Sequence, residues 1–210
     1  MIRILVADDH AVVRKGLKQI VADAPDMVIA AEASNGHEAL NKALENDYDI
    51  VLLDITMPDR SGLDILKEIK SQKPELPVLI LSMHPEEQYA VRALKAGAAG
   101  YLTKESAPEE LIKAMRKVSD GGKYVTSSLA EKLASVLKTG AETPRHQALS
   151  DREYQVLCMI ASGKRVKQIA DELLLSAKTI STYRSRVLRK MNMNNNIELT
   201  RYAIENRLVS

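Results

Sequence analysis

Cysteine and aromatic residues are scarce in this sequence of 210 residues. It contains one cysteine, Cys158, neither Trp nor Phe, and seven Tyr. One cysteine excludes an internal disulfide framework and a zinc site made of cysteines alone. A core without Trp or Phe must consist mainly of Leu, Ile, Val, Ala and Met. Cys158 lies in an apolar helical stretch, where we expect it to pack into that core.

Long hydrophobic runs are also lacking. The longest ones, Ile50–Leu53 and Pro77–Leu81, are far shorter than the roughly 20 residues that span a bilayer. The apolar N-terminal segment Met1–Ala7 is interrupted by Asp8-Asp9-His10, so it is too short for a secretory signal. We therefore expect a cytoplasmic protein without a membrane segment.

The charges are divided unevenly along the chain. Residues 1–122 contain 15 Lys or Arg and 20 Asp or Glu, a net charge of −5. Residues 123–210 contain 15 basic and 8 acidic residues, a net charge of +7. This division predicts two domains with different partners, and the basic one suits a nucleic acid.

Up to residue 120, short apolar runs alternate with helical periods. Strands are expected at Ile2–Ala7, Val28–Glu32, Ile50–Leu53, Val78–Leu81 and Gly100–Leu102, and helices near 11–23, 36–46, 62–72, 86–96 and 107–119. Five such alternations predict an α/β fold with a doubly wound parallel sheet. Ser106 to Glu109 has the pattern of a capping box, with Ser106 as the N-cap of the helix expected near 107–119.

The second part of the chain has a different pattern. Between 121 and 147 we expect a linker with one helix over Ser127–Leu137. A second capping box, Ser150 to Glu153, then starts a helix, and three more follow near 166–174, 177–191 and 196–206. The predicted organisation is an α/β domain over 1–120, a linker over 121–147 and an all-α domain of four helices over 148–210.

Polar side chains follow four of the predicted strands. Asp8 and Asp9 follow the first strand, Asp54 the third and Ser82 the fourth, while Lys104 lies two residues beyond the fifth. If the strand order is 2-1-3-4-5, these residues converge at the carboxyl edge of the sheet, where such folds bind ligands. Three adjacent carboxylates repel one another and favour a cation, and an all-oxygen site favours Mg²⁺. A hydroxyl and an ammonium group facing that ion suit a phosphoryl group, which an Asp can accept covalently.

Each of these residues has an ordinary alternative. An Asp after a strand usually caps a helix or lies in a loop, and an isolated Ser or Lys is usually a surface residue. Coincidence would have to explain all five positions together, so we favour the binding site.

The same residues lie in motifs of a known family. Val6–His10, Leu53–Pro58 with Ser61-Gly62, Leu81-Ser82 and Gly97–Lys104 resemble the receiver domain of two-component response regulators. The resemblance covers about residues 1–120 and implies the five-stranded, flavodoxin-like fold with strand order 2-1-3-4-5. It implies that Asp54 accepts a phosphoryl group from a sensor histidine kinase.

The resemblance also implies the metal ligands. Asp9 and Asp54 would bind Mg²⁺ directly, together with the main-chain carbonyl of Thr56, and Asp8 would act mainly through water. His10 is instead expected to be a polar surface residue at the start of the first helix.

The resemblance gives roles to five residues around the phosphate. Lys104 would pair with the acyl phosphate, and Ser82 and Tyr101 would form the switch pair, with Tyr101 turned inward. The positions of Thr56 and His84 help set the lifetime of the phosphate in this family.

The segment from Lys178 to Lys190 has five basic residues and no acidic one. On a helical wheel its apolar face comprises Ile180, Tyr183, Val187, Leu188 and Met191, and the opposite face Lys178, Ser181, Thr182, Ser185 and Arg189. Small hydroxyl side chains can approach base edges in a major groove, and cations reach phosphates. Ser176 would cap this helix and direct its N-terminus at a phosphate. A basic helix can also be an ordinary solvated surface.

Leu149–Leu157, Ile169–Leu173 and Ser176–Ile180 resemble the LuxR-type helix-turn-helix of the NarL/FixJ response regulators. Ser181–Arg184 and Ile197–Thr200 are most similar to the GacA and BvgA type. The expected DNA-binding residues are Lys178, Thr179, Ser181, Thr182, Arg184, Ser185, Arg186 and Arg189.

Three positions depart from the common pattern of the family. Ser181 and Tyr183 replace the Lys and His of many members, which puts a shared operator sequence in doubt. Val166 replaces the usual capping Ser or Thr, so we expect a looser or differently capped helix there.

Together these features predict a DNA-binding transcription regulator, not an enzyme, that is switched by phosphorylation of Asp54 and forms a homodimer when phosphorylated. One alternative is a receiver that signals through protein contacts and binds DNA without selectivity. Another is an aspartyl-phosphate phosphatase. Against the phosphatase, Thr56 leaves no Asp two residues after Asp54 to protonate a leaving group.

Overall fold

The computed structural model describes residues 1–127, 129–131 and 144–209. The chain divides into two compact units, Met1–Leu133 and Ala134–Ser210. None of the helices in the described residues is long and apolar enough to cross a membrane.

The N-terminal unit contains a parallel five-stranded sheet in the order β2-β1-β3-β4-β5. Its strands are β1 (Ile2–Ala7), β2 (Met27–Ala33), β3 (Ile50–Leu53), β4 (Val78–Ser82) and β5 (Gly100–Thr103). The helices are α1 (Ala11–Ala22), α2 (Gly36–Glu45), α3 (Gly62–Gln72), α4 (Glu86–Lys95) and α5 (Pro108–Ser119). The predicted fold class and strand order are confirmed.

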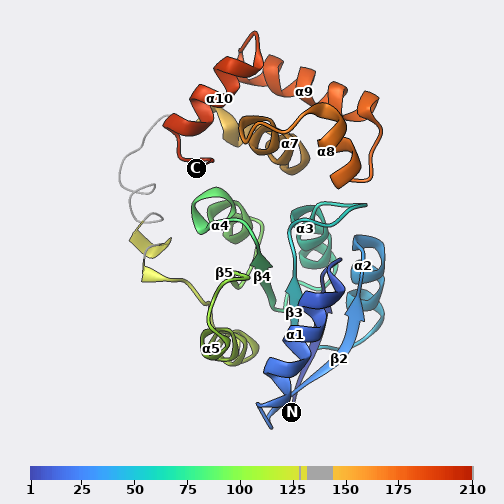
Figure 1. The fold of residues 1–210 in the computed structure, drawn as a ribbon. Helices are drawn as coiled ribbons and strands as arrows, with labels where there is room; N and C mark the ends of the chain where they lie inside the picture. The colour runs from blue at the N-terminus through green and yellow to red at the C-terminus, as the bar shows by residue number, and fades with distance from the viewer. Residues whose placement is uncertain (128, 132–143, 210) are drawn as a thin grey trace. The chain divides into compact units, whose positions relative to one another are not determined.

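Helices cover both faces of this sheet. Figure 1 shows α1 and α5 on one face and α2, α3 and α4 on the other. Strands β3 and β4 are buried throughout, as their uniformly apolar sequences predict. The core under α1 and α5 joins Leu17 and Val21 to Met115 and Val118. Packing on both faces leaves the carboxyl ends of the strands to form a site.

The expected capping box at Ser106 is wrong. Helix α5 begins at Pro108, its N-cap is Ala107, and no side chain caps it. The Ser106 hydroxyl lies 3.4 Å from the Thr103 hydroxyl instead. Pro favours the first position of a helix, and this shifts the N-cap one residue beyond Ser106.

The helix expected over Ser127–Leu137 is only partly covered by the described residues. Residues 127 and 129–131 are helical, and the Thr126 hydroxyl accepts the N–H of Leu129 at 3.2 Å. The rest of that helix, and the linker residues that follow it up to 143, lie outside the described residues. A short 3₁₀-helix, η1 (Arg145–Ala148), precedes the helical domain.

The C-terminal unit is helical in its described part. It contains α7 (Asp151–Ala161), α8 (Val166–Glu172), α9 (Ala177–Met191) and α10 (Asn196–Glu205). The expected capping box at Ser150 and Glu153 is present, and Ser176 caps α9. Helix α8 is capped by Gln168, whose side-chain oxygen accepts the N–H of Arg165 at 2.8 Å. The expected cap position is wrong by one residue, because the N-cap is Arg165 and Val166 is the first residue of α8; the start of the helix has no capping hydroxyl, as predicted.

Candidate functional site

Three charged side chains meet at the carboxyl edge of the sheet. The Lys104 ammonium lies 2.6 Å from Asp8 Oδ2 and 2.7 Å from Asp54 Oδ2. The three side chains come from the ends of β1, β3 and β5, and each is 5% exposed or less. The structure thus brings together residues that lie up to 96 positions apart, and the cation offsets the repulsion between the carboxylates.

The loop after Asp54 turns back closely on itself. The N–H of Gly62 donates to the carbonyl of Ile55 at 2.8 Å. A Cβ at position 62 would lie 2.0 Å from the carbonyl oxygen of Asp54. Only glycine allows this approach, so the motif Ser61-Gly62 has a steric reason.

Burial and neighbouring charges shift the pKa values of Asp54 and Lys104 in the pocket. Burial raises the pKa of Asp54 from 3.8 to about 6, against the opposing effect of Lys104, and the charge of Asp8 adds to the rise. Burial lowers the pKa of Lys104, but the two carboxylates outweigh it and the net shift is upward. The ammonium group is therefore held in its charged form, as a counter-ion for the carboxylates.

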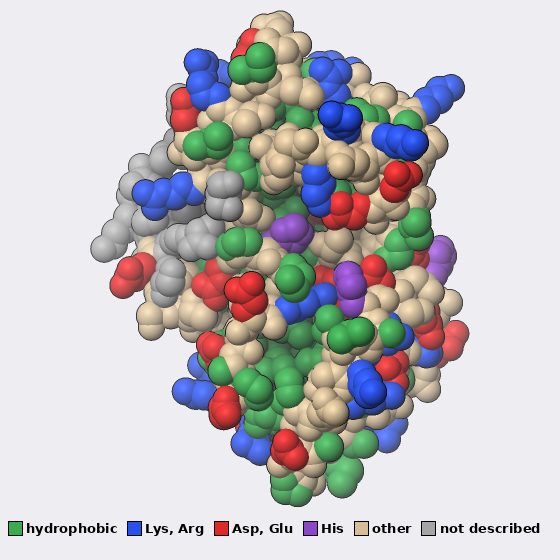
Figure 2. Space-filling view, in the orientation of Figure 1, with side chains coloured by type: hydrophobic (Ala, Val, Ile, Leu, Met, Phe, Trp, Pro, Cys, Tyr) green, Lys and Arg blue, Asp and Glu red, His purple; other side chains and the backbone are tan. Residues whose placement is uncertain are grey.

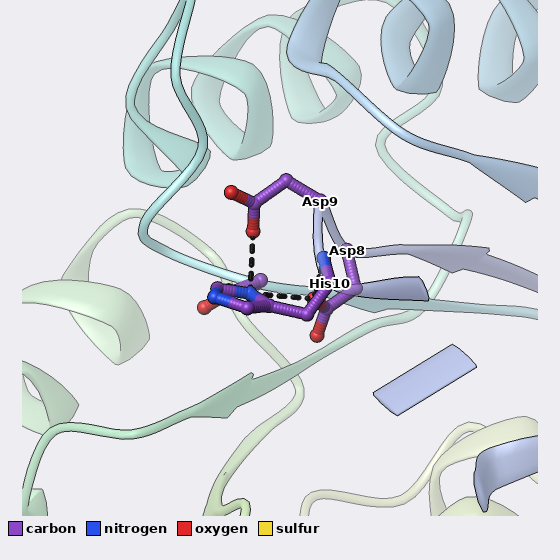
Figure 3. A group of neighbouring side chains, drawn as sticks. Asp8, Asp9 and His10 are labelled. Atoms are coloured by element: carbon purple, nitrogen blue, oxygen red, sulfur yellow. Dashed lines mark hydrogen bonds and ion pairs between the residues drawn. The ribbon is translucent and has the colours of Figure 1, made fainter. Parts of the chain in front are cut away.

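Asp9 completes an acidic group with Asp8, His10 and Asp54, whose potential ligand atoms lie within 4.8 Å of one another. The His10 ring lies between the two neighbouring carboxylates, with Nδ1 2.7 Å from Asp9 and 3.3 Å from Asp8 (Figure 3). His10 is the N-cap of α1 and its side chain is 59% exposed, which confirms the expected surface position. The oxygen-rich group is compatible with a divalent metal ion.

The two expected switch residues both contact His84. The Tyr101 hydroxyl donates to the His84 carbonyl at 2.7 Å, and the Tyr101 side chain is fully buried. The N–H of His84 donates to the Ser82 hydroxyl at 3.2 Å. The His84 ring nitrogen Nε2 lies 3.1 Å from the Thr56 hydroxyl. The strand spacing did not predict that His84 would connect Thr56, Ser82 and Tyr101.

Arg14 is a further residue of this edge that the motifs did not reveal. From α1, it donates to the main-chain carbonyl of Asp8 at 2.8 Å. It also lies 3.3 Å from Glu32 at the end of β2. Arg14 therefore fixes the turn that carries the first two carboxylates. Helical spacing gave no reason to distinguish it from other basic residues.

In the C-terminal unit, α9 has the two faces predicted for it. Ile180, Val187 and Met191 are fully buried. The residues expected on the opposite face, Lys178, Ser181, Thr182, Ser185 and Arg189, are all exposed. Lys and Arg side chains are prominent on the part of the surface that this unit forms (Figure 2).

Local hydrogen bonds order this exposed face. The hydroxyls of Ser181, Thr182 and Ser185 donate to carbonyls one turn earlier, at 2.8 to 3.0 Å. The guanidinium of Arg184 donates to Asn196 Oδ1 at 2.7 Å. Because Asn196 lies in the first turn of α10, it connects the basic helix to its neighbour.

Comparisons with known proteins give the family of both parts. Residues 4–116 match the response regulator receiver domain, and residues 147–203 match the bacterial regulatory proteins of the luxR family. The chain is 36% identical to the response regulator UvrY of Escherichia coli K12, over 99% of this chain and 96% of UvrY. It is 35% identical to the response regulator GacA of Pseudomonas aeruginosa, over 100% of this chain and 98% of GacA.

Solved structures show the same arrangement of domains along the chain. RcsB from Salmonella enterica serovar Typhimurium, bound to promoter rprA with the phosphomimetic BeF₃⁻, is 26% identical with a TM-score of 0.65. That match covers 96% of this chain and 97% of RcsB. A structure of two RcsB dimers bound to two parallel DNAs is 25% identical with a TM-score of 0.61, and covers 100% of this chain and 99% of that one.

These relationships argue against one of the alternatives drawn from the sequence, the phosphatase. The matched families and the similar proteins are regulators and not phosphatases, and the predicted similarity to GacA is confirmed. The chain belongs to the two-component response regulators of the NarL/FixJ type, in which a receiver domain is followed by a LuxR-type DNA-binding domain.

Proposed function

We propose that phosphorylation of Asp54 switches this response regulator. The observation that carries the proposal is the buried Asp54 carboxylate, 2.7 Å from the Lys104 ammonium at the carboxyl edge of the sheet. An Asp54 oxygen would attack the phosphorus of a phosphohistidine on the partner kinase. A P–O bond then forms, the P–N bond breaks, and the imidazole leaves.

Mg²⁺ is the cofactor that suits the acidic pocket. Asp9, Asp54 and the main-chain carbonyl of Thr56 would be its protein ligands, with Asp8 acting through water. The Asp9 side chain is 30% exposed, which leaves room for the water ligands that Mg²⁺ retains. When bound, the ion would neutralise charge on the oxygens of the transferred phosphoryl group.

Lys104, Ser82 and Tyr101 would respond to the phosphoryl group. Lys104 would pair with its oxygens and the Ser82 hydroxyl would donate a hydrogen bond to it, because phosphorylation adds negative charge and strong acceptors. Movement of Ser82 toward the phosphate would alter its bond with the His84 amide. Since Tyr101 donates to the carbonyl of the same residue, this backbone would carry the change to the switch tyrosine.

The output would be binding of promoter DNA by α9 in the major groove. Exposed hydroxyl groups on one face of this helix would approach base edges, and the cations would bind phosphates. The proposed DNA-binding residues are Lys178, Thr179, Ser181, Thr182, Arg184, Ser185, Arg186 and Arg189.

We assign the receiver to residues 1–120, the linker to 121–147 and the DNA-binding domain to 148–210. Phosphorylation would reorient the last domain and favour a homodimer that recognises two half-sites, as the dimeric RcsB on DNA suggests. Ile197 and Ile204 on α10 are 81% and 58% exposed beside the oppositely charged Arg201 and Glu205. These four residues form an exposed strip on α10 that would contact a second copy of the chain in the homodimer. A protein that binds promoters in this way would act in the cytoplasm.

The test is the intact mass after incubation with acetyl phosphate and Mg²⁺. We expect the wild type to gain one phosphoryl group, about 80 Da, as an aspartyl-phosphate. The variant D54A, and the wild type without Mg²⁺, should gain none. Equal modification of D54A, or no modification of the wild type by acetyl phosphate or by a cognate kinase, would contradict the proposal.

A further inference from the structure

The loop between β3 and α3, residues 54–61, is anchored by an acidic residue outside the pocket, Asp59. Asp59 Oδ1 accepts the N–H of Gly36 at 2.7 Å, and Asp59 Oδ2 accepts the N–H of His37 at 2.8 Å. Both donors belong to the first turn of α2. One carboxylate therefore joins the loop that follows the phosphoacceptor to the start of a separate helix.

The start of a helix is a favourable place for this carboxylate. The first N–H groups of a helix lack partners within it, and the positive end of its dipole attracts an anion. Asn35 Oδ1 accepts the next N–H, that of Glu38, at 2.9 Å. Burial acts to raise the pKa of Asp59, but the hydrogen bonds from Gly36, His37 and Arg60 outweigh it and lower that pKa. Asp59 is thus charged at neutral pH.

The loop also lies directly against this turn of α2. A Cβ at Gly36 would lie 3.0 Å from Asp59 Oδ1 and 3.1 Å from the Cβ of Arg60. The Arg60 guanidinium in turn donates to Glu68 on α3 at 2.6 Å. Asp59 and Arg60 therefore fix the tip of the loop between two helices.

Among the loop residues after Asp54, Thr56 is the one whose position bears on the metal site. The N–H of Asp54 donates to the Ala7 carbonyl at 2.9 Å, so the sheet itself fixes the phosphoacceptor. Thr56, two residues later, lies beyond the sheet, and its N–H reaches only the Asp54 carboxylate, at 3.2 Å. Apart from the contact of the Thr56 hydroxyl with the His84 ring at 3.1 Å, the position of Thr56 consequently depends on the contacts of the loop.

We propose that Asp59 is a positioning residue for the metal site: by holding the loop on α2, it fixes the segment that carries the Thr56 carbonyl. This inference rests on the proposed function, in which that carbonyl is a metal ligand. Residues that orient ligands from outside a metal site commonly affect its affinity by about 10- to 100-fold.

The test is calorimetric titration of the full chain with Mg²⁺ alone. We expect D59A to raise the Mg²⁺ dissociation constant by about tenfold, and D59N, which retains one acceptor oxygen, to raise it less. The matched control is N35A, which removes a cap from the same helix without touching the loop. Both alanine variants should lower the melting temperature, but N35A should leave Mg²⁺ affinity unchanged.

Unchanged Mg²⁺ affinity in D59A would overturn the positioning role and leave the proposed function intact. An equal loss in N35A would also overturn it, because a general weakening of α2 would then explain both variants. A wild type that binds no Mg²⁺ would overturn the proposed function and this inference together.

Discussion

In the receiver pocket, Asp8, Asp54 and Lys104 are at most 5% exposed and contact one another, whereas the charged side chains on the outer face of α9 are exposed. Two buried carboxylates share one ammonium group, so removal of Lys104 leaves both of them without a counter-ion. Each exposed charge of α9 is solvated, so it does not need a neighbouring charge of opposite sign. Loss of Lys104 should therefore be severe, and loss of a single charge on the helix should have a smaller effect.

The largest effect should come from Lys104. The substitution K104M leaves two buried carboxylates without a cation and should lower the free energy of unfolding by about 3 kcal/mol. Urea denaturation without Mg²⁺ measures this. The control K18M removes the partially exposed ion pair between Lys18 and Glu32 and should cost less than about 0.5 kcal/mol. Similar losses of unfolding free energy in the two variants would contradict the expected difference between buried and exposed charges.

On α9, we expect separable contributions to DNA binding. R184A should weaken binding to all duplexes and reduce the slope of log affinity against log salt by about 1. N196A removes the bond that orients Arg184 but keeps its charge, so affinity should fall with the slope unchanged. Fluorescence anisotropy at several salt concentrations measures both. A changed slope in N196A would show that Asn196 does more than orient Arg184.

In the described part of the C-terminal unit, the buried Glu153 pairs with Lys190, which is 37% exposed, so this ion pair is intermediate between the two groups of charges. Burial acts to raise the pKa of Glu153, but the Lys190 ammonium at 2.6 Å and the N–H of Ser150 outweigh it and hold that pKa below 4.5. Its stabilisation is therefore present above pH 4.5 and is lost as the pH falls through the lowered value.

The variant E153Q should cost about 1 kcal/mol at pH 7 and flatten the acid dependence of thermal unfolding between pH 7 and pH 3. Circular dichroism follows the transition. E205Q, in the exposed pair with Arg201, should leave that dependence as in the wild type. An unaltered profile in E153Q would show that this ion pair does not set acid stability.

The smallest effects concern backbone strain in the loops before α8 and α9. Leu174 has φ of 50° and is 73% exposed, so L174G should stabilise the protein by about 0.5 kcal/mol. The reverse change, G163A at φ of 83° with open space around it, should cost about 1 kcal/mol. Urea denaturation measures both changes. Destabilisation by L174G would indicate that the Leu174 side chain has a stabilising contact.

The sequence predicted the features that depend on regular spacing. Parallel strands place Asp8, Asp54 and Lys104 at one edge, and helical periodicity places Ile180 and Val187 in the core, so both sets could be found from their positions alone. These are consequences of backbone geometry and need no knowledge of the partner element.

Features that depend on a particular partner were missed. Nothing in the segment around Asp59 indicates that it caps a helix starting 23 residues earlier, because the contact exists only after the sheet has formed. The N-cap of α5 was misplaced by one residue because Pro108 competes with Ser106 for the start of the helix. The same limit applies to Arg184 and Asn196, which come from separate helices.

The most direct test is whether phosphorylation controls DNA binding through Asp54. Duplexes selected from a random pool by the acetyl-phosphate-treated wild type would be titrated with wild type and D54A, each with and without acetyl phosphate and Mg²⁺. Treatment should promote dimerisation and tighten selective binding only in the wild type. A D54A protein that dimerises and binds these duplexes as the treated wild type does would contradict this prediction. Equal binding to unrelated duplexes would instead support a receiver that acts through protein contacts.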